Sequence, residues 1–243
     1  MSTGTLYIVS TPIGNLEDIT MRALRILSEV DLIAAEDTRK TSILLNHYTI
    51  KKPLTSYFEH NEQVKTGWLV SQLKEGKNIA LVSEAGTPTI SDPGFRIVAA
   101  AIAESIPVVP LPGVCAAIAA LSASGLAVHR FAFEGFLPPK SGKRKNLLKK
   151  IAGEERTLIF YESPYRIQAA IADMLEVLGD RRAVVARELT KLHEEFIYGT
   201  LSVLADKLGS SVIKGEFTVV VEGCPAKRSM TISNGAARHA PGR

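Results

Sequence analysis

Three turns rich in glycine and proline are the parts of this sequence whose residue types point most clearly to ligand binding. They read TPIGN (11–15), EAGTPTISDPG (84–94) and LPGVCAA (111–117), and short apolar runs precede them. In open α/β sheets, ligands bind outside the carboxyl ends of the strands, where small residues let backbone groups reach the ligand. A ligand read mainly by backbone groups is polar without being highly anionic, and S-adenosylmethionine fits that description. Each turn alone is equally typical of ordinary β-turns.

Other ligand classes lack their motifs in this chain. No G-x-x-x-x-G-K-[ST] loop occurs, and the turn STPIGN has one glycine where a dinucleotide-binding fingerprint needs three. The five histidines are scattered, and neither H-x-x-x-H nor C-x-x-C occurs. We therefore expect no nucleotide triphosphate, no NAD and no metal site.

A basic segment follows Pro138-Pro139. It contains no acidic residue, and its cations are Lys140, Lys143, Arg144, Lys145, Lys149 and Lys150. Such a segment suits the phosphate backbone of a nucleic acid. The alternative is a solvated helix face that binds nothing, because charge runs are usually of that kind.

The elements that must position these residues alternate between short apolar runs and helical patterns, which indicates an α/β fold. We expect an α/β subdomain with a mostly parallel sheet in residues 1–112. A second α/β subdomain with a mixed or antiparallel sheet is expected in 113–223, because helices are sparser between its apolar runs. Residues 224–243 are polar and small without periodicity, so we expect a disordered tail there.

The overall composition describes a soluble chain in a reducing compartment. The sequence has 243 residues, 46% of them hydrophobic, with a net charge of +4 and two cysteines that suit neither a disulfide framework nor a zinc site. No signal peptide is visible, and three prolines interrupt the longest uncharged run, residues 105–128, so it is too short to span a bilayer. These features favour a cytoplasmic protein without a membrane partner.

Eight ordered motifs carry a resemblance to a known family. They are STPIGNLEDIT, AAEDTRKT, ALVSEAGTPTISDPG, LPGVCAAIAALSASGL, FEGFLPP, LIFYESPYRI, ARELTKLHEE and GEFTVVVEG. Together they resemble the 16S ribosomal RNA 2′-O-ribose methyltransferases of the tetrapyrrole methylase-like superfamily. The resemblance implies two α/β subdomains with S-adenosylmethionine in the cleft between them, and a homodimer. It also implies methylation of a cytidine ribose 2′-hydroxyl in the decoding region of 16S rRNA, with the small ribosomal subunit as partner.

The turns and the resemblance together predict the cofactor-binding residues. The loop 84–94 resembles the main cofactor-binding turn of the family, and the ends of neighbouring strands supply the other wall. The predicted set is Pro12, Ala85, Gly86, Thr87, Ile90, Ser91, Asp92, Cys115, Ala116, Phe160, Tyr161 and Glu162.

Methyl transfer to a ribose hydroxyl implies a residue that handles the hydroxyl proton. Our preferred cluster is AEDTR, with Glu36, Asp37 and Arg39, and Glu188 in ARELT is a further candidate. Asp37 could instead cap the helix that follows it. Glu59 and His60 in YFEHNE remain open as alternatives, and an ion pair of Arg187 with Glu188 is as consistent with the sequence as catalysis is.

The predicted RNA-binding residues are Lys140, Lys143, Arg144, Lys145 and His60. Two other functions stay open at this point. One is a sister methyltransferase that acts on a tetrapyrrole or a protein side chain, and the other is an RNA-binding factor without enzymatic activity.

Overall fold

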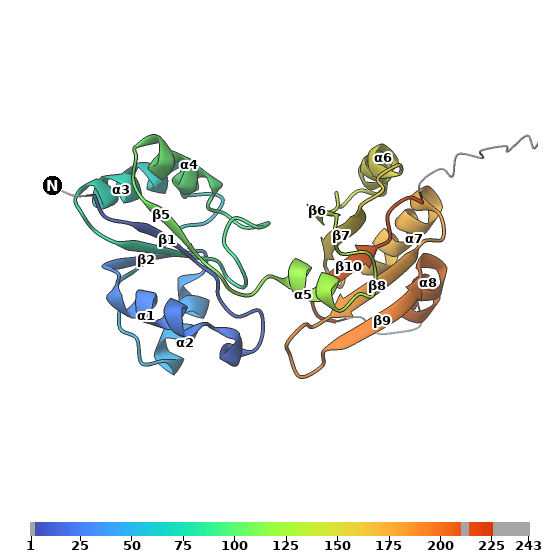
Figure 1. Cartoon of the computed structure of the whole chain (residues 1–243), viewed down its shortest axis with the longest axis horizontal. Helices are drawn as coiled ribbons and strands as arrows, with labels where there is room; N and C mark the ends of the chain where they lie inside the picture. The colour runs from blue at the N-terminus through green and yellow to red at the C-terminus, as the bar shows by residue number, and fades with distance from the viewer. Residues whose placement is uncertain (1–2, 210–213, 226–243) are drawn as a thin grey trace, which may run out of the picture.

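The computed structural model describes residues 3–209 and 214–225 as two lobes that lie side by side (Figure 1). Each lobe has its own five-stranded sheet, and the chain passes from the first sheet to the second between Leu111 and Ala116. We call residues 3–111 the N-terminal lobe and residues 116–225 the C-terminal lobe. The predicted subdomain boundary after residue 112 stays a prediction, and the predicted tail lies largely outside the described residues.

The first sheet is entirely parallel, in the order β3-β2-β4-β1-β5. Its strands are β1 (Leu6–Val9), β2 (Leu32–Ala35), β3 (Leu54–Ser56), β4 (Ile79–Val82) and β5 (Val108–Leu111). Every residue of β4 is buried, which explains its continuous apolar sequence, since a parallel strand covered on both faces has no polar side.

Helices cover both faces of this sheet. The helices α1 (Met21–Glu29) and α2 (Thr38–His47) pack on one face, and α3 (Glu62–Lys74) and α4 (Phe95–Ala103) pack on the other (Figure 1). A short 3₁₀ helix, Leu16–Asp18, precedes α1. Because all strands run in one direction, the turns after β1, β2, β4 and β5 lie together at the carboxyl ends of the strands, on one side of the sheet.

The second sheet is mixed, in the order β6-β7-β10-β8-β9. Its strands are β6 (Phe131–Phe136), β7 (Thr157–Glu162), β8 (Arg182–Arg187), β9 (Glu195–Thr200) and β10 (Phe217–Val221). The pair β6–β7 is parallel and the other three pairs are antiparallel. These two sheets confirm the predicted α/β fold with a mostly parallel first half and a mixed second half.

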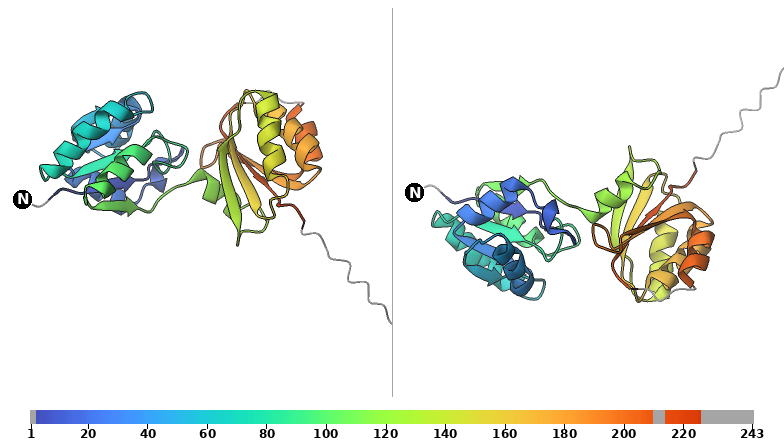
Figure 2. Two further views of the ribbon diagram at one scale, coloured as in Figure 1. Left: turned by 90° about the horizontal axis from the view of Figure 1, so that it is seen from above. Right: turned by 90° about the horizontal axis from the view of Figure 1, so that it is seen from below.

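Within the part of the chain that the structure describes, three helices cover one face of the second sheet, and one helix packs on the opposite face. The covering helices are α6 (Ser141–Ile151), α7 (Ile167–Leu178) and α8 (Leu201–Gly209), whose apolar side chains form one core with the strands. The single helix is α5 (Ala116–Ser122), which directly follows the crossing between the lobes (Figures 1 and 2). None of the helices within the described residues is long and apolar enough to cross a bilayer.

Candidate active site

A cleft of about 390 Å³ lies between the two lobes. The N-terminal lobe contributes the turns after β1, β2 and β4, and the C-terminal lobe contributes the ends of β6 and β7 and the start of β10. Its lining residues are Ile13, Glu36, Glu84, Ala85, Thr87, Ile90, Ser91, Asp92, Cys115, Ala116, Phe136, Tyr161, Glu162, Ser163, Pro164, Leu189, Glu216, Phe217 and Thr218. Its size is that of a typical small-molecule site, and it is the candidate active site.

The three glycine- and proline-rich turns meet on the N-terminal side of this cleft. Thr11 and Gly86 exchange two backbone hydrogen bonds, of 2.8 and 2.9 Å. The hydroxyl of Thr87 donates to the carbonyl of Val114 at 2.9 Å and lies 2.9 Å from the hydroxyl of Ser10. Gly86 has φ of +90°, a conformation that glycine adopts readily and other residues rarely do. The turns are therefore tied into one rigid wall.

Most of the predicted cofactor residues line the cleft. The residues at the wall are Ala85, Thr87, Ile90, Ser91, Asp92, Cys115, Ala116, Tyr161 and Glu162. Pro12 and Gly86 are not lining residues, but their chain neighbours Ile13, Ala85 and Thr87 line the cleft, and Gly86 pairs with the backbone of Thr11. The expectation for Phe160 needs correction, because its side chain is fully buried in the core between the second sheet and its covering helices.

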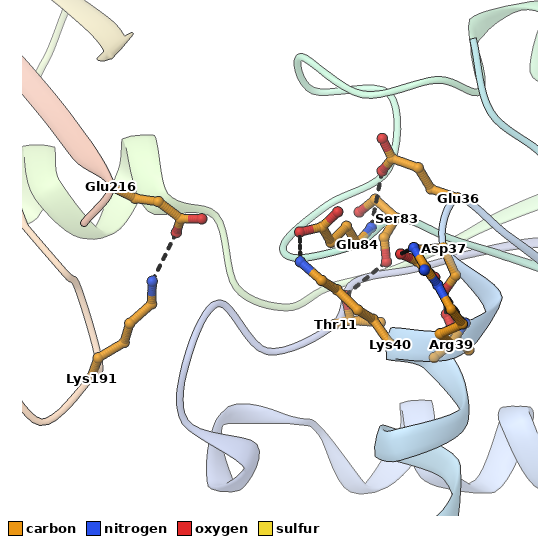
Figure 3. A network of polar contacts seen from close by, with 10 residues as sticks. Thr11, Glu36, Asp37, Arg39, Lys40, Ser83, Glu84, Lys191 and Glu216 are labelled. Carbon is orange, nitrogen blue, oxygen red and sulfur yellow. Dashed lines mark hydrogen bonds and ion pairs between the residues drawn. The ribbon is translucent and has the colours of Figure 1, made fainter. Parts of the chain in front are cut away.

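Three carboxylates gather on the N-terminal wall. Glu36 follows β2, and its Oε2 accepts the backbone N–H of Glu84 at 3.0 Å. Glu84 follows β4 and forms an ion pair with Lys40 of α2, which Figure 3 shows reaching toward it. Asp92 lies in the same loop, and burial, followed by repulsion from Glu36, raises its pKa to about 7. Sequence reasoning places Glu36 and Asp92 at the site but misses Glu84.

Asp37 points to Arg39 and is not part of the cleft wall (Figure 3). It is the N-cap of α2, and its Oδ1 accepts the backbone N–H of Arg39 at 2.9 Å. The guanidinium of Arg39, 89% exposed, donates to the same carboxylate at 2.9 and 3.2 Å. The Arg39 side-chain and backbone hydrogen bonds lower the pKa of Asp37 to about 2. Asp37 therefore caps α2, as the alternative from the sequence predicted, and its part in proton transfer stays a prediction.

Glu188 is also held in a structural network. It has φ of +51°, pairs with Lys191 at 2.8 Å, and accepts the backbone N–H of Glu216 at 3.0 Å. The hydrogen bond from Lys191 lowers the pKa of Glu188. Lys191 also pairs with Glu216, on the side of the cleft that faces Glu84 (Figure 3). Leu189, which follows Glu188, lines the cleft, although the sequence did not suggest it as a site residue.

Aromatic side chains form the C-terminal wall. Tyr161 is half-buried, and its hydroxyl accepts the N–H of Ala117 at 3.1 Å. Burial raises the pKa of Tyr161, so the phenol is neutral near pH 7. Phe136 packs edge-to-face on Tyr161, with ring centroids 5.7 Å apart, yet it remains 53% exposed. The Arg166 guanidinium lies 5.9 Å from the centroid of the Phe136 ring. Sequence reasoning also misses this ring.

Glu162 is the buried carboxylate of this wall. Its Oε1 accepts the N–H of Ser163 at 2.8 Å and pairs with Arg166 at 2.7 Å. Its Oε2 is buried and has no hydrogen-bond partner in the described part of the chain. A buried acceptor without a partner is costly, so a ligand that donates a hydrogen bond there would be favoured.

The predicted RNA-binding residues differ in their accessibility. Lys140 and Lys143 are exposed at the start of α6, and His60 is exposed in the turn before α3, away from the cleft lining. Lys145 is engaged by Glu176 at 2.6 Å. The expectation for Arg144 is wrong, because its side chain is 3% exposed and pairs with Asp173 at 2.6 Å.

Comparisons with known proteins agree with this fold. The family model "Tetrapyrrole (Corrin/Porphyrin) Methylases" matches residues 5–205. The "Ribosomal RNA small subunit methyltransferase I" of Haemophilus influenzae is 57% identical over 226 residues, which cover 92% of this chain and 80% of that protein. The protein of the same name from Thermotoga maritima is 49% identical over 220 residues, covering 90% of this chain and 99% of that one.

A solved structure shares the arrangement of the two lobes. It is the uroporphyrin-III C-methyltransferase from Thermus thermophilus complexed with S-adenosylhomocysteine, with a TM-score of 0.63 at 20% identity, covering 89% of this chain and 97% of that one. The chain belongs to the tetrapyrrole methylase family of S-adenosylmethionine-dependent methyltransferases.

The residues of the cleft fit this cofactor. Its volume of about 390 Å³ suits a molecule of that size. Glu36, Glu84 and Asp92 offer negative charge to a ligand whose sulfonium and ammonium groups are cationic. The unpartnered Oε2 of Glu162 offers an acceptor to an amino or hydroxyl group.

Proposed function

We propose that this chain transfers a methyl group from S-adenosylmethionine to the 2′-hydroxyl of a cytidine ribose in the decoding region of 16S rRNA. The observation that carries the proposal is the identity of 49% to 57% with ribosomal RNA small subunit methyltransferases over about nine tenths of the chain. The cleft supplies a matching site, with a carboxylate wall for a cationic cofactor and an open aromatic edge for a base.

The open edge of the cleft suits a nucleotide. One face of the Phe136 ring lies against Arg166, the ring meets Tyr161 in an edge-to-face contact, and half of the side chain remains exposed. RNA-binding proteins commonly stack unpaired bases on such rings. Lys140 and Lys143 offer further exposed cations for phosphates. Arg39, whose guanidinium is held by Asp37, offers another exposed cation close to Glu36 (Figure 3).

The proposed assembly is a homodimer that acts in the cytoplasm, where small ribosomal subunits are found. Ala117 and Ala120 of α5 are buried against the chain's own second sheet. The outer side of α5, where Ile118 is 49% exposed, is a candidate contact surface.

The test is a methyl-transfer assay with labelled S-adenosylmethionine. Small subunits from a host that lacks the modification are one substrate, and free uroporphyrinogen III is the other. We expect label in 16S rRNA, located on a ribose by primer extension at low nucleotide concentration. Label on the tetrapyrrole alone, or on neither substrate, would refute the proposal.

A matched pair of variants controls this assay. Ala116→Phe fills the cleft and should abolish cofactor binding and methylation together. Ala99→Phe introduces the same side chain at an exposed position of α4 and should leave both unchanged.

A further inference from the structure

Asp92 is the one carboxylate of the N-terminal wall that neither an ion pair nor a backbone N–H holds within the described residues. Glu84 is balanced by Lys40, and Glu36 accepts a backbone N–H. Asp92 receives only the hydroxyl of Ser83, while Glu36 and Glu84 repel its negative charge.

Among the described residues, no cation on the facing lobe relieves this repulsion. The phenol of Tyr161, on β7, senses the charge of Asp92 and is neutral near pH 7. A Cβ atom built on Gly135 of β6 would lie 3.1 Å from the hydroxyl of Ser91, so the facing strand approaches the loop closely beside Asp92. In the ligand-free protein, Asp92 therefore holds a proton up to neutral pH, because its pKa is about 7.

We propose that binding of the cationic cofactor displaces the proton that Asp92 holds in the ligand-free protein, and that the ionised Asp92 then accepts the proton of the substrate hydroxyl. The proposal rests on the methyl-transfer function proposed above. When bound, S-adenosylmethionine supplies a methyl group on a cationic sulfur. Positive charge beside three carboxylates favours the ionised form of Asp92, so binding of the cofactor expels its proton.

The transfer step then balances in charge. The O–H bond of the ribose breaks and its proton goes to the Asp92 carboxylate, the oxygen forms the new bond to the methyl carbon, and the electron pair of the C–S bond stays on sulfur. The sulfur loses its positive charge in the same step, so Asp92 regains its affinity for a proton just as the proton arrives. The cleft keeps a constant net charge throughout.

Asp37 is less suited to this role. Arg39 donates to both of its carboxylate oxygens, and its pKa of about 2 makes it a weak base. A general base works best when its pKa lies near the working pH, as that of Asp92 does.

Proton release on binding is the direct test. Calorimetry at pH 7 in buffers of different ionisation enthalpy counts the protons released when S-adenosylmethionine or S-adenosylhomocysteine binds. For S-adenosylmethionine we expect the wild type to release about half a proton more than Asp92→Asn does, because a group with a pKa of about 7 is half protonated at that pH. For S-adenosylhomocysteine, whose sulfur is a neutral thioether, the difference in proton release between wild type and Asp92→Asn should be smaller. Equal proton release from wild type and Asp92→Asn with S-adenosylmethionine would overturn the proposal.

Turnover gives the second measurement. Asp92→Asn should bind cofactor and RNA yet lose about 10²- to 10⁴-fold in kcat, as expected for the loss of a general base. Glu29→Gln, which removes an exposed carboxylate of α1, is the matched control and should keep normal kcat. Normal turnover in Asp92→Asn would refute the inference alone, whereas absence of RNA methylation by the wild type would refute the proposed function.

A third measurement needs no variant and covers the case in which Asp92→Asn does not fold. The affinity of the wild type for S-adenosylmethionine should rise between pH 6 and pH 8 more steeply than its affinity for S-adenosylhomocysteine. Parallel pH profiles for the two ligands would contradict the proposed exchange of charge.

Discussion

Asp37 and Arg39 form a local unit in which one carboxylate caps α2 and orients a guanidinium. The pKa of Asp37 in the folded chain is about 2, below the ordinary 3.8, so the folded state favours its ionised form. The resulting stability is fully present above about pH 4 and is lost as the pH falls through 2. We therefore expect Asp37→Ala to lower the Tm at pH 7, and the difference from wild type to shrink near pH 2.5.

Thermal unfolding followed by circular dichroism at the two pH values measures this difference. Unchanged Tm together with a large loss of turnover would instead restore Asp37 as the proton-handling residue.

Phe136 makes a second residue-scale prediction. If its exposed ring stacks on a base of the RNA, Phe136→Ala should raise the KM for small subunits about 5- to 150-fold, since such stacking contributes about 1–3 kcal/mol. Phe136→Tyr keeps the ring and should stay near wild type. Cofactor affinity, measured by calorimetry, should be equal in all three proteins. A loss confined to cofactor affinity would assign the ring to the cofactor.

Sequence reasoning located site residues well where the backbone of a turn forms the site. It located them poorly where the direction of a side chain decides whether that side chain lines the cleft. The turn at Gly86 and Thr87 was recognisable because glycine and proline punctuate a chain locally. Phe160 and Arg144 were misplaced because a strand or helix position does not reveal which face meets the core. Phe136 and Glu84 were missed because their significance depends on the opposite lobe and on neighbouring strands.

The loop 84–94 is the element whose backbone geometry is most demanding. Gly86 holds φ of +90° while pairing with Thr11, and an L side chain there costs about 1–2 kcal/mol. Gly86→Ala should therefore lower the free energy of unfolding and weaken cofactor binding, because the loop wall must shift.

Gly67, in the middle of α3, is the matched control because a Cβ there meets nothing within 4 Å. Gly67→Ala should raise stability by about 0.5–1 kcal/mol and leave cofactor binding unchanged. Urea unfolding and calorimetry measure both quantities. Equal cofactor affinity in Gly86→Ala and wild type would separate this turn from the site.

Helix α6 has exposed cations, whose replacement should weaken RNA binding, and one buried cation, whose replacement should lower stability. Lys143, Lys149 and Lys150 are exposed, so replacing all three with Ala should weaken RNA binding regardless of sequence. The slope of log affinity against log salt should flatten by about 0.7 for each phosphate that the variant no longer neutralises. Arg144→Ala should instead cost up to about 3–5 kcal/mol of stability, because the buried Asp173 loses its shortest ion pair and keeps Ser141 and the longer ion pair with Lys145. An unchanged salt slope in the triple variant would show that this surface does not bind RNA.

Long elements were predictable from their apolar periodicity, and short or amphipathic ones at the edges were not. The buried strands β4, β7 and β10 stand out as apolar runs, and α7 has a clear helical pattern. The three-residue β3 has no fully buried position, so its sequence carries no strand signal. Helix α8 begins directly where β9 ends, without the turn residues that usually mark such a boundary.

At the scale of the whole molecule, the proposed homodimer is open to direct measurement. Sedimentation at micromolar concentration should give the mass of two chains. Ile118→Asp places a charge on the outer side of α5 and should shift the protein toward a single chain, while its circular dichroism stays unchanged. A single chain in the wild type would refute the dimer, and a dimer in Ile118→Asp would place the contact elsewhere.

The position of β10 governs the order in which the protein can fold during translation. The first sheet uses only residues 6–111 and can form early, as N-terminal units generally do. β10, the last strand of the described residues, lies between β7 and β8 at the centre of the second sheet. Until residues 217–221 leave the ribosome, β7 and β8 each lack a central partner and expose an edge that can pair with other chains. Insertion of this late strand joins distant segments and should be slow. The nascent chain therefore completes its C-terminal wall, and with it the ability to hold a cofactor, only after residues 217–221 have been synthesised.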